Sequence, residues 1–292
     1  MPTVGRAVGK SAHVRALACA ILYSMCSAPS LSCRSHLYYK TRQYDAATLA
    51  LIRATPRVVE IEYRTSAGRQ VSFYVAPERE PTQPPEQLWL LFGGIDTLAF
   101  GWHQWMKDLP NKNCGLLLIE YPGYGLCEGL PRAKTILESS RAAWAALARH
   151  LDSPPQRLER NLGLLGHSLG SLTMLQFAPH VAAQRLVLIS PMTSLAEQTK
   201  QMYGPFVGVP LSLINPDRYD NRARLRELVR RPNPPRITII HGGADAVVPV
   251  AMGRELAALA PSLTTYYEIP GAGHPGLIAA QLDLLFQVMG GE

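Results

Sequence analysis

The chain has 292 residues, of which 47% are hydrophobic and 17% are charged. Intrinsic disorder requires few hydrophobic and many charged residues, so this composition excludes a largely disordered chain. The 23 glycines and 24 prolines are spread along the sequence and no segment repeats at a fixed period, which excludes collagen-like and solenoid architectures. The length fits one large α/β domain or two small ones.

The formal net charge of +7 is concentrated at the N-terminus. The first 40 residues contain five basic residues and no acidic one, which leaves the rest of the chain with only two more basic than acidic groups. A nucleic-acid-binding surface needs its positive excess on the folded body. We therefore expect no nucleic-acid partner, and we interpret the arginine-rich stretch 218–236 as a solvated helix face.

Residues 1–33 have the pattern of a signal peptide or N-terminal membrane-targeting segment. A basic region ends at Arg15, an apolar stretch runs from Ala16 to about Ala28, and small residues follow. The apolar stretch is shorter than the roughly 20 residues of a transmembrane helix. The pattern predicts export to the periplasm, the exterior or a membrane surface, with peripheral membrane association through the N-terminus. An uncleaved anchor, or a mis-assigned start codon on a cytoplasmic protein, is the alternative.

The cysteines do not form a disulfide framework. Residues 30–33 resemble the cleavage box of a bacterial lipoprotein, although Leu31 stands two residues before Cys33 instead of three, so lipid attachment at Cys33 is a secondary hypothesis. Cys114 and Cys127 flank a predicted strand, whose ends lie roughly 20 Å apart. We expect both to be free, partly buried thiols.

The regular elements begin after a mixed segment, residues 34–57, which we interpret as a linker or a short edge helix. Apolar runs and β-branched residues predict eight strands, at 58–64, 71–75, 87–92, 115–119, 162–165, 186–189, 237–240 and 264–269. Helical periodicity predicts helices over 134–150, 169–178 and 275–289.

Five of these strands are continuous apolar runs, which is typical of strands buried on both faces. Strands that alternate with helices need right-handed crossovers and form a mostly parallel sheet. We therefore predict an α/β domain over residues 58–292, in which a sheet of about eight strands carries helices on both faces. Ligands bind such a sheet beyond the carboxyl ends of its strands.

The segment Gly166-His167-Ser168-Leu169-Gly170 lies directly between a predicted strand and a predicted helix. A G-x-S-x-G pattern in this context is typical of a nucleophile elbow. The sharp turn strains the serine backbone, so the residues two before and two after it must be small. It also places the Ser168 hydroxyl at a helix N-terminus, whose free N–H groups stabilise developing negative charge. We predict that Ser168 is a catalytic nucleophile.

An acid and a histidine follow in the order that such a nucleophile requires. Asp245 comes after the strand that ends at Ile240, and His274 comes after the strand that ends at Ile269. An imidazole takes the serine proton, and a carboxylate holds that imidazole in one tautomer. Taken alone, each residue would be interpreted as a loop or helix cap, but together with Ser168 they predict a triad. We expect His241 to support the acid loop and His167 to point away from the site.

An oxyanion hole needs two N–H donors. One is the backbone N–H of Leu169, the residue after the nucleophile, and the other should come from the loop after the strand 87–92. Glycines in this loop, Phe92-Gly93-Gly94-Ile95-Asp96, allow the backbone to approach a substrate closely. We assign the second donor to the N–H of Ile95.

From about residue 58 to residue 290 the chain resembles the α/β-hydrolases, within the branch that holds Bem46-like proteins, palmitoyl-protein thioesterase-like enzymes and monoacylglycerol lipases. The resemblance rests on the stretches LLFGGI, EYPGYGLCEGLP, LGHSLG, SPMTSL with the later DRYDN, and HGGADAVVP with IPGAGH. It implies an α/β-hydrolase fold and a catalytic domain over 58–292. Gly93 stands where the family usually has a histidine before the oxyanion glycine. The segment 194–235, which forms a cap in related enzymes, is short here and implies a small lid.

These residues predict a serine hydrolase that cleaves a carboxylic ester or thioester through an acyl-enzyme, with a small-molecule or lipid-like acyl substrate. No cofactor is expected, and no histidine has metal-ligand spacing to a partner. A serine peptidase or an acyltransferase would use the same triad. A non-catalytic binding protein with this fold is the alternative from another class.

Overall fold

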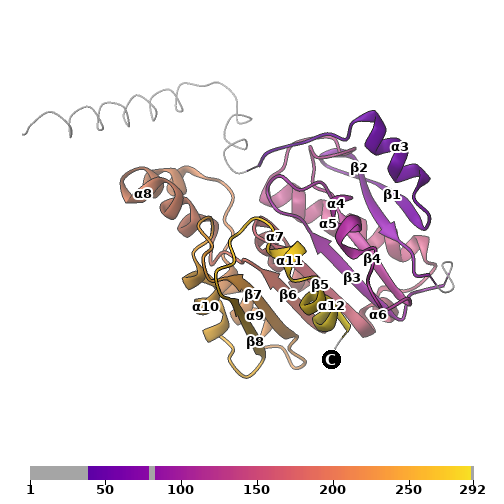
Figure 1. The fold of residues 1–292 in the computed structure, drawn as a ribbon. Helices are drawn as coiled ribbons and strands as arrows, with labels where there is room; N and C mark the ends of the chain where they lie inside the picture. The colour runs from indigo at the N-terminus through magenta and orange to yellow at the C-terminus, as the bar shows by residue number, and fades with distance from the viewer. Residues whose placement is uncertain (1–38, 79–82, 291–292) are drawn as a thin grey trace, which may run out of the picture.

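The computed structural model describes residues 39–78 and 83–290. The predicted leader, with Cys33, lies outside these residues. The described chain forms one eight-stranded sheet with helices on both faces, which confirms the predicted α/β class (Figure 1).

The sheet is parallel except at one side. Its strands are β1 (Val58–Thr65), β2 (Gly68–Val75), β3 (Gln87–Phe92), β4 (Cys114–Ile119), β5 (Leu162–His167), β6 (Arg185–Ile189), β7 (Arg236–Gly242) and β8 (Thr264–Ile269). Their order is β1-β2-β4-β3-β5-β6-β7-β8. β2 pairs antiparallel with β1 and β4, and all other neighbours pair in parallel. The parallel strands therefore end at one common edge.

Helices connect the parallel strands and cover both faces of the sheet. They are α3 (Ala46–Ala54), α4 (Gly101–Met106), α5 (Ala133–His150), α6 (Pro155–Leu158), α7 (Leu169–Phe177), α8 (Leu195–Ile214), α9 (Asn221–Leu228), α10 (Val250–Ala258), α11 (Leu277–Ala280) and α12 (Leu282–Gly290). None of the helices in the described part of the chain is long and apolar enough to cross a membrane.

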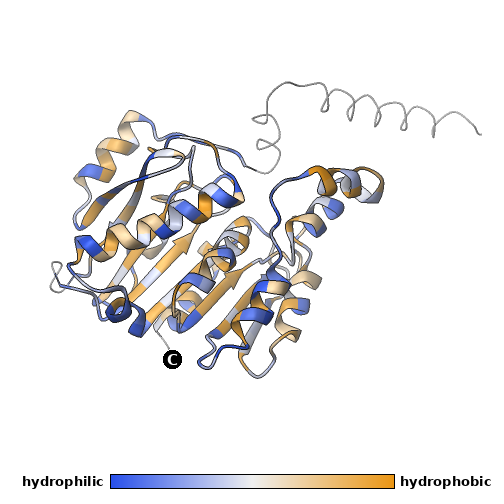
Figure 2. Cartoon of the chain, turned by 180° about the vertical axis from the view of Figure 1, so that it is seen from behind, coloured by the Kyte–Doolittle hydropathy of each residue, from blue (hydrophilic) through white to orange (hydrophobic). Residues whose placement is uncertain are grey.

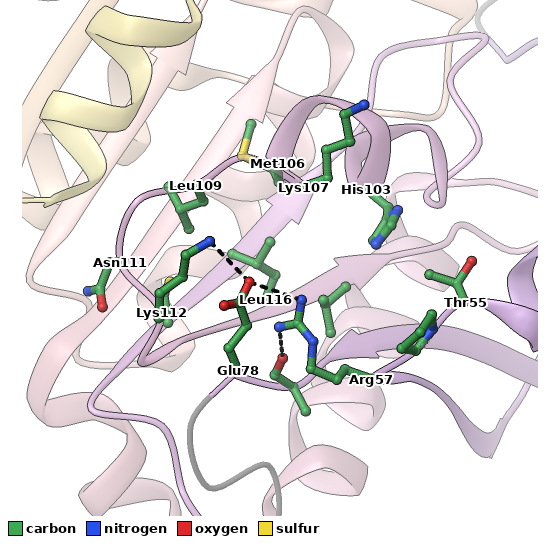
Figure 3. A pocket seen from close by; sticks show the side chains of 14 residues that line it. Thr55, Arg57, Glu78, His103, Met106, Lys107, Leu109, Asn111, Lys112 and Leu116 are labelled. Atoms are coloured by element: carbon green, nitrogen blue, oxygen red, sulfur yellow. Dashed lines mark hydrogen bonds and ion pairs between the residues drawn. The ribbon is translucent and has the colours of Figure 1, made fainter.

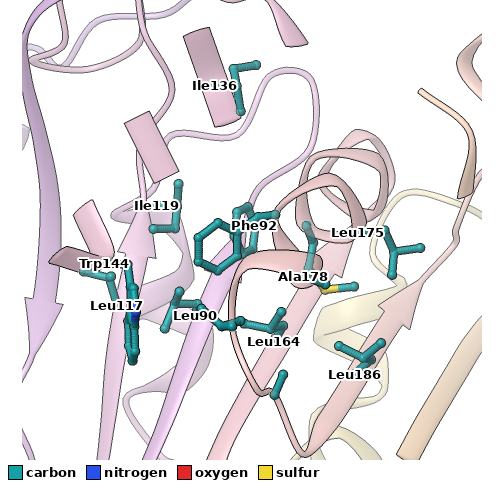
Figure 4. Packing of buried hydrophobic residues seen from close by; sticks show 14 of the residues in the cluster. Leu90, Phe92, Leu117, Ile119, Ile136, Trp144, Leu164, Leu175, Ala178 and Leu186 are labelled. Atoms are coloured by element: carbon teal, nitrogen blue, oxygen red, sulfur yellow. The ribbon is translucent and has the colours of Figure 1, made fainter. Parts of the chain in front are cut away.

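Each face of the sheet has its own hydrophobic core, because successive residues of a strand point to opposite faces. Leu88, Leu90 and Phe92 of β3 pack with α5, α7, α9 and α10. Figure 4 shows Leu90 and Phe92 in this cluster. Trp89 and Leu91 of the same strand pack with α3, α4, α11 and α12. Trp89 and Phe92 are fully buried, so truncating either to alanine should cost about 3–5 kcal/mol. This double burial explains why β3 is apolar at every position after Gln87.

The predicted helix over 275–289 is two helices, α11 and α12, because Gln281 leaves the helical region at φ −123° and ψ 29°. Nothing in the sequence marks this break. The segment 194–235 contains α8 and α9, and α8 bends sharply at Gly204, where φ is 72°. This connection has the small size that the sequence predicted for a lid.

Residues 39–45, here called the N-terminal strap, run across the loops that follow β3 and β4 before α3 begins. Lys40 N–H donates to the carbonyl oxygen of Ile95 at 3.3 Å, and Gly125 N–H donates to that of Arg42 at 2.8 Å. The Gln43 side chain donates to the carbonyl oxygen of Gly123 at 3.0 Å. The segment that the sequence left as a linker or edge helix is thus a strap followed by a helix.

Candidate active site

Four loops bring the predicted site residues to the carboxyl edge of the parallel sheet. Ile95 follows β3, Ser168 follows β5, Asp245 follows β7 and His274 follows β8. Because parallel strands end at the same edge, residues far apart in the sequence meet there.

The turn between β5 and α7 holds Ser168 in a strained backbone conformation, with φ 55° and ψ −118°. Such a conformation costs a non-glycine residue about 1–3 kcal/mol. Two sets of contacts hold it: Ser168 N–H donates to the carbonyl oxygen of Ile189 at 2.9 Å, and the Ser168 carbonyl oxygen accepts the N–H and the hydroxyl of Ser171. A Cβ at Gly170 would overlap the carbonyl oxygen of Phe92. The G-x-S-x-G spacing therefore follows from close backbone packing.

His274 joins Ser168 to Asp245. Its Nε2 lies 3.1 Å from Ser168 Oγ, and its Nδ1 lies 2.8 Å from Asp245 Oδ2. The Asp245 side chain is fully buried, whereas the His274 side chain is 13% exposed. The structure thus brings together all three residues that the sequence predicted for a triad, in the order hydroxyl, imidazole, carboxylate.

The Asp245 carboxylate is fixed from both of its oxygens. Oδ1 accepts the N–H groups of Val247 and Val248 at 2.9 and 2.8 Å, which leaves Oδ2 facing His274. The buried His241 places its Nε2 3.0 Å from the carbonyl oxygen of Val248 and 3.5 Å from Asp245 Oδ2. His241 therefore supports the acid loop, as the sequence suggested.

Backbone hydrogen bonds tie the acid loop to the histidine loop. Gly243 N–H donates to the carbonyl oxygen of Ile269 at 2.8 Å, and Ala244 N–H donates to that of Ala272 at 2.9 Å. The distance between the carboxylate and the imidazole is therefore set by backbone contacts on both sides of the pair.

The electrostatics of the pair favour a charged carboxylate. Burial raises the pKa of Asp245, but hydrogen bonds from His241, His274 and Val248 N–H outweigh it and hold that pKa well below its ordinary value. Asp245 is therefore ionised at neutral pH, where it can stabilise a positive charge on His274.

The prediction that His167 points away from the site is wrong. Its ring lies 5.2 Å from the ring of His274 and is tilted by 30° from it. Burial, with a smaller contribution from His274, lowers the pKa of His167 to about 3, so the ring is uncharged at neutral pH. It adds no second positive charge beside an imidazolium at His274. The elbow motif does not specify the direction of this ring.

The two predicted oxyanion donors, the N–H groups of Leu169 and Ile95, have no hydrogen-bond acceptor among the described residues. Leu169 is the first residue of α7, where a helix leaves its N–H groups free. The Gly94 carbonyl oxygen accepts Thr97 N–H at 3.3 Å. Because the C=O and N–H of a trans peptide point in opposite directions, the N–H of Ile95 points away from that turn. Both donors are available to a ligand.

The loop that carries Ile95 is held from its outer side. The Ile95 carbonyl oxygen accepts Lys40 N–H from the strap at 3.3 Å and the hydroxyl of Tyr124 at 2.6 Å. Arg42 of the strap donates to the carbonyl oxygen of Asp96 at 3.4 Å. Sequence reasoning missed these supports, although Tyr124 lies in the EYPGYG stretch that carried part of the family resemblance.

A buried carboxylate, Glu120, anchors the far end of the same loop. It accepts the hydroxyl of Tyr44 at 2.6 Å and the N–H of Ala99 at 3.2 Å. Phe100 N–H in turn donates to the Tyr44 hydroxyl at 3.1 Å. Burial raises the pKa of Glu120 to about 8, against the lowering effect of these hydrogen bonds. A Cβ at Gly125 would come 2.5 Å from Glu120 Oε2, so this glycine makes room for the carboxylate.

A pocket lies away from the triad, near the amino end of β4. This pocket of about 200 Å³ is lined by residues of α4 and of the segments around β1, β2 and β4 (Figure 3). Its one carboxylate, Glu78, is already engaged, since it pairs with both Arg57 and Lys112. It shares no residue with the triad, and its lining residues offer no activated nucleophile.

The fold and the site geometry together define a protein of the α/β-hydrolase class. The model of the Alpha/beta hydrolase family matches residues 89–233. The chain is 33% identical over 166 residues to the Mycobacterium tuberculosis protein Rv2307c, an alignment that covers 57% of this chain and 55% of that protein. It is 26% identical over 186 residues to Alpha/beta hydrolase domain-containing protein 17C of Xenopus tropicalis, covering 62% and 54%. The chain thus spans about half the length of these curated relatives.

Solved structures share the fold. An α/β-hydrolase from Vibrio vulnificus superimposes with a TM-score of 0.67 and 17% identity, covering 86% of this chain and 88% of that one. The esterase PF2001 of Pyrococcus furiosus gives a TM-score of 0.61 at 15% identity, covering 86% and 97%. These likenesses show that the chain has the α/β-hydrolase fold.

Proposed function

We propose that this protein is a serine hydrolase that cleaves a carboxylic ester or thioester through an acyl-enzyme on Ser168. The observation that carries the proposal is the continuous hydrogen-bonded series from Ser168 Oγ through His274 to Asp245. The strained elbow supports it, because strain of this kind is found at functional sites and here it falls on the serine that faces His274.

In the proposed reaction each residue has one step. His274 Nε2 accepts the Ser168 proton as Oγ attacks the acyl carbon, and Asp245 stabilises the imidazolium that forms. The N–H groups of Leu169 and Ile95 donate to the oxyanion. His274 then protonates the leaving alcohol or thiol, and the acyl group stays on Ser168 Oγ. A water molecule, deprotonated by His274, releases the carboxylic acid and restores the enzyme.

The test is hydrolysis of p-nitrophenyl esters and acyl thioesters of increasing chain length by the full chain. Ser168→Ala should lower kcat by about 10⁶-fold, as loss of the nucleophile does in Ser-His-Asp hydrolases. Ser262→Ala, at an exposed serine before β8, is the matched control and should keep the parent rate. Equal turnover by the parent and Ser168→Ala would overturn the proposal.

A further inference from the structure

The helix α8 forms a hairpin that projects beyond the carboxyl ends of the strands (Figures 1 and 2). The chain reverses at Gly204, and the second half packs back on the first at Gly208. A Cβ at Gly208 would come 2.6 Å from the Cα of Lys200 and 2.7 Å from the carbonyl oxygen of Thr199. We call residues 195–214 the α8 hairpin.

The outer end of the α8 hairpin is apolar and exposed. Phe206 has 91% of its surface exposed and Met202 has 56%, and Tyr203, Val207 and Val209 are also exposed. Figure 2 shows this end of the hairpin as a hydrophobic turn. No charged residue occurs from 201 to 216. Soluble proteins rarely gather exposed apolar side chains in this way unless the surface binds something.

The shape of this surface favours a lipid bilayer over a second protein. A stable protein interface buries about 800 Å² on each partner and is broad. The α8 hairpin instead presents one bent turn, with Phe206 at an extreme exposure of 91%. A narrow apolar end with a tyrosine beside it matches segments that enter the boundary between head groups and acyl chains.

Basic residues lie around the base of the α8 hairpin. Arg218 donates to the carbonyl oxygens of Ser212 and Leu213 and forms no ion pair with a described residue. Lys40 and Arg42 are exposed on the N-terminal strap. Of the acidic residues nearby, Glu197 pairs with Lys200 and Asp217 is buried, whereas Asp96 and Asp220 are exposed and keep their charge. The three basic residues outnumber these two carboxylates, and this slight positive excess favours an anionic surface.

The chain outside the described residues joins the domain at the same place. The Tyr39 hydroxyl lies 3.2 Å from that of Tyr219, whose carbonyl oxygen accepts the N–H of Leu195, the first residue of α8. Residues 1–38 contain four basic residues, no acidic residue and the apolar stretch 16–28. The N-terminal segment and the α8 hairpin both have features suited to an anionic membrane, and they join the domain at the same position.

The α8 hairpin also contacts the acid loop directly. Gln198 donates to the carbonyl oxygen of Val247 at 2.7 Å, and Val247 N–H donates to Asp245 Oδ1 at 2.9 Å. Val247 itself is 45% exposed. One residue thus links the exposed apolar surface to the triad.

We propose that the α8 hairpin docks on an anionic phospholipid bilayer by inserting Phe206 and its apolar neighbours, which turns the carboxyl edge of the sheet toward the lipid. The docking stands independently of the catalytic chemistry. Its consequence, that the acyl substrate is presented from a lipid surface, rests on the proposed function of Ser168.

The test is co-sedimentation of the full chain with phosphatidylcholine vesicles, prepared with and without phosphatidylglycerol. All variants carry Ser168→Ala, so lipid turnover does not affect binding. Phe206→Ser should weaken binding to the phosphatidylglycerol vesicles by on the order of tenfold, because a buried phenyl group is lost from the lipid. The matched control is Leu51→Ser, at a residue of α3 that is 54% exposed, and it should bind like its parent.

Phe206→Trp supplies a second measurement that does not depend on affinity. Bromine on the acyl chains should quench its added fluorescence, with the Phe206 parent as the blank. Equal binding by the Phe206→Ser and Leu51→Ser variants, or no quenching in Phe206→Trp, would overturn the proposal. So would a shift from dimer to monomer on Phe206→Ser without loss of vesicle binding, since that result assigns the surface to a second copy. Because binding is measured without the nucleophile, none of these outcomes depends on the proposed function.

Discussion

The substitution Asp245→Asn gives the sharpest test of the proposed roles, because the structure determines which way the new amide must face. Asp245 Oδ1 accepts two backbone N–H groups, from Val247 and Val248. Only the amide oxygen of an asparagine can replace it there, so the NH₂ group must occupy the position of Oδ2, 2.8 Å from His274 Nδ1. Two donors cannot face each other, so His274 would carry its proton on Nε2.

A proton on Nε2 removes the base that Ser168 needs at 3.1 Å. The fold should survive, since the substitution is isosteric and both backbone hydrogen bonds remain. We expect kcat to fall about 10⁴-fold, which is the effect of the same tautomer change in other Ser-His-Asp enzymes. This equals about 5 kcal/mol of lost transition-state stabilisation.

The assay is kcat and KM on a soluble p-nitrophenyl ester, with thermal unfolding to verify the fold. Glu62→Gln is a matched control, because Glu62 is an exposed carboxylate on β1 that pairs with Arg69 away from the triad. We expect the control to stay within a few-fold of the parent. A rate for Asp245→Asn within tenfold of the parent would refute the reasoning and remove Asp245 from the triad.

Three further predictions concern the surroundings of the site. Burial raises the pKa of Glu120 to about 8, so from pH about 4.5 to 8 the folded protein keeps a proton that the unfolded chain releases. The free energy of unfolding should fall by up to about 5 kcal/mol over this range, and Glu120→Gln should flatten the fall in urea titrations at a series of pH values. Tyr124→Phe removes the shorter of the two hydrogen bonds to the Ile95 carbonyl and should lower kcat about tenfold with little change in KM, as steady-state kinetics will report. Burial raises the pKa of Cys114 and Cys127 to about 12, so mass mapping should find neither alkylated by iodoacetamide until urea is added.

Each of these predictions has a contrary result. If the free energy of unfolding falls with pH as steeply in Glu120→Gln as in the parent, the Glu120 carboxyl is not the group that titrates. A rise in KM with kcat unchanged would assign Tyr124 to substrate binding instead of support of the oxyanion loop. Rapid alkylation of Cys114 or Cys127 in the native protein would contradict their burial.

The strands and the nucleophile elbow were accessible from sequence because their signals are local. The run from Gln87 to Phe92 is apolar at each position but the first, and the structure shows why: two hydrophobic cores, one on each face, both need it. The elbow is equally local at Gly166, because a Cβ there would come 2.5 Å from the carbonyl oxygen of Gly170, four residues further on. The other two residues of the predicted triad, Asp245 and His274, were then found from their order after Ser168 in the sequence.

The features that the sequence did not predict depend on contacts between distant segments, which no local pattern encodes. The N-terminal strap supports Ile95 across 55 residues of sequence through Lys40, and Tyr44 reaches Glu120 in the same region. The orientation of His167 was predicted wrongly because the elbow motif does not specify the direction of this ring, which lies 5.2 Å from the ring of His274. The α8 hairpin was visible only as a short lid segment, and its reversal depends on Gly204 and Gly208 acting together.

The central claim is that Ser168 Oγ is an activated nucleophile. The measurement that tests it most directly is peptide mapping by mass spectrometry after brief exposure of the full chain to a fluorophosphonate, beside its Ser168→Ala and His274→Ala variants. We predict a single phosphonate adduct on the peptide that carries Ser168, and none in either variant. An adduct at another serine, or no adduct in a folded parent protein, would contradict the proposed mechanism.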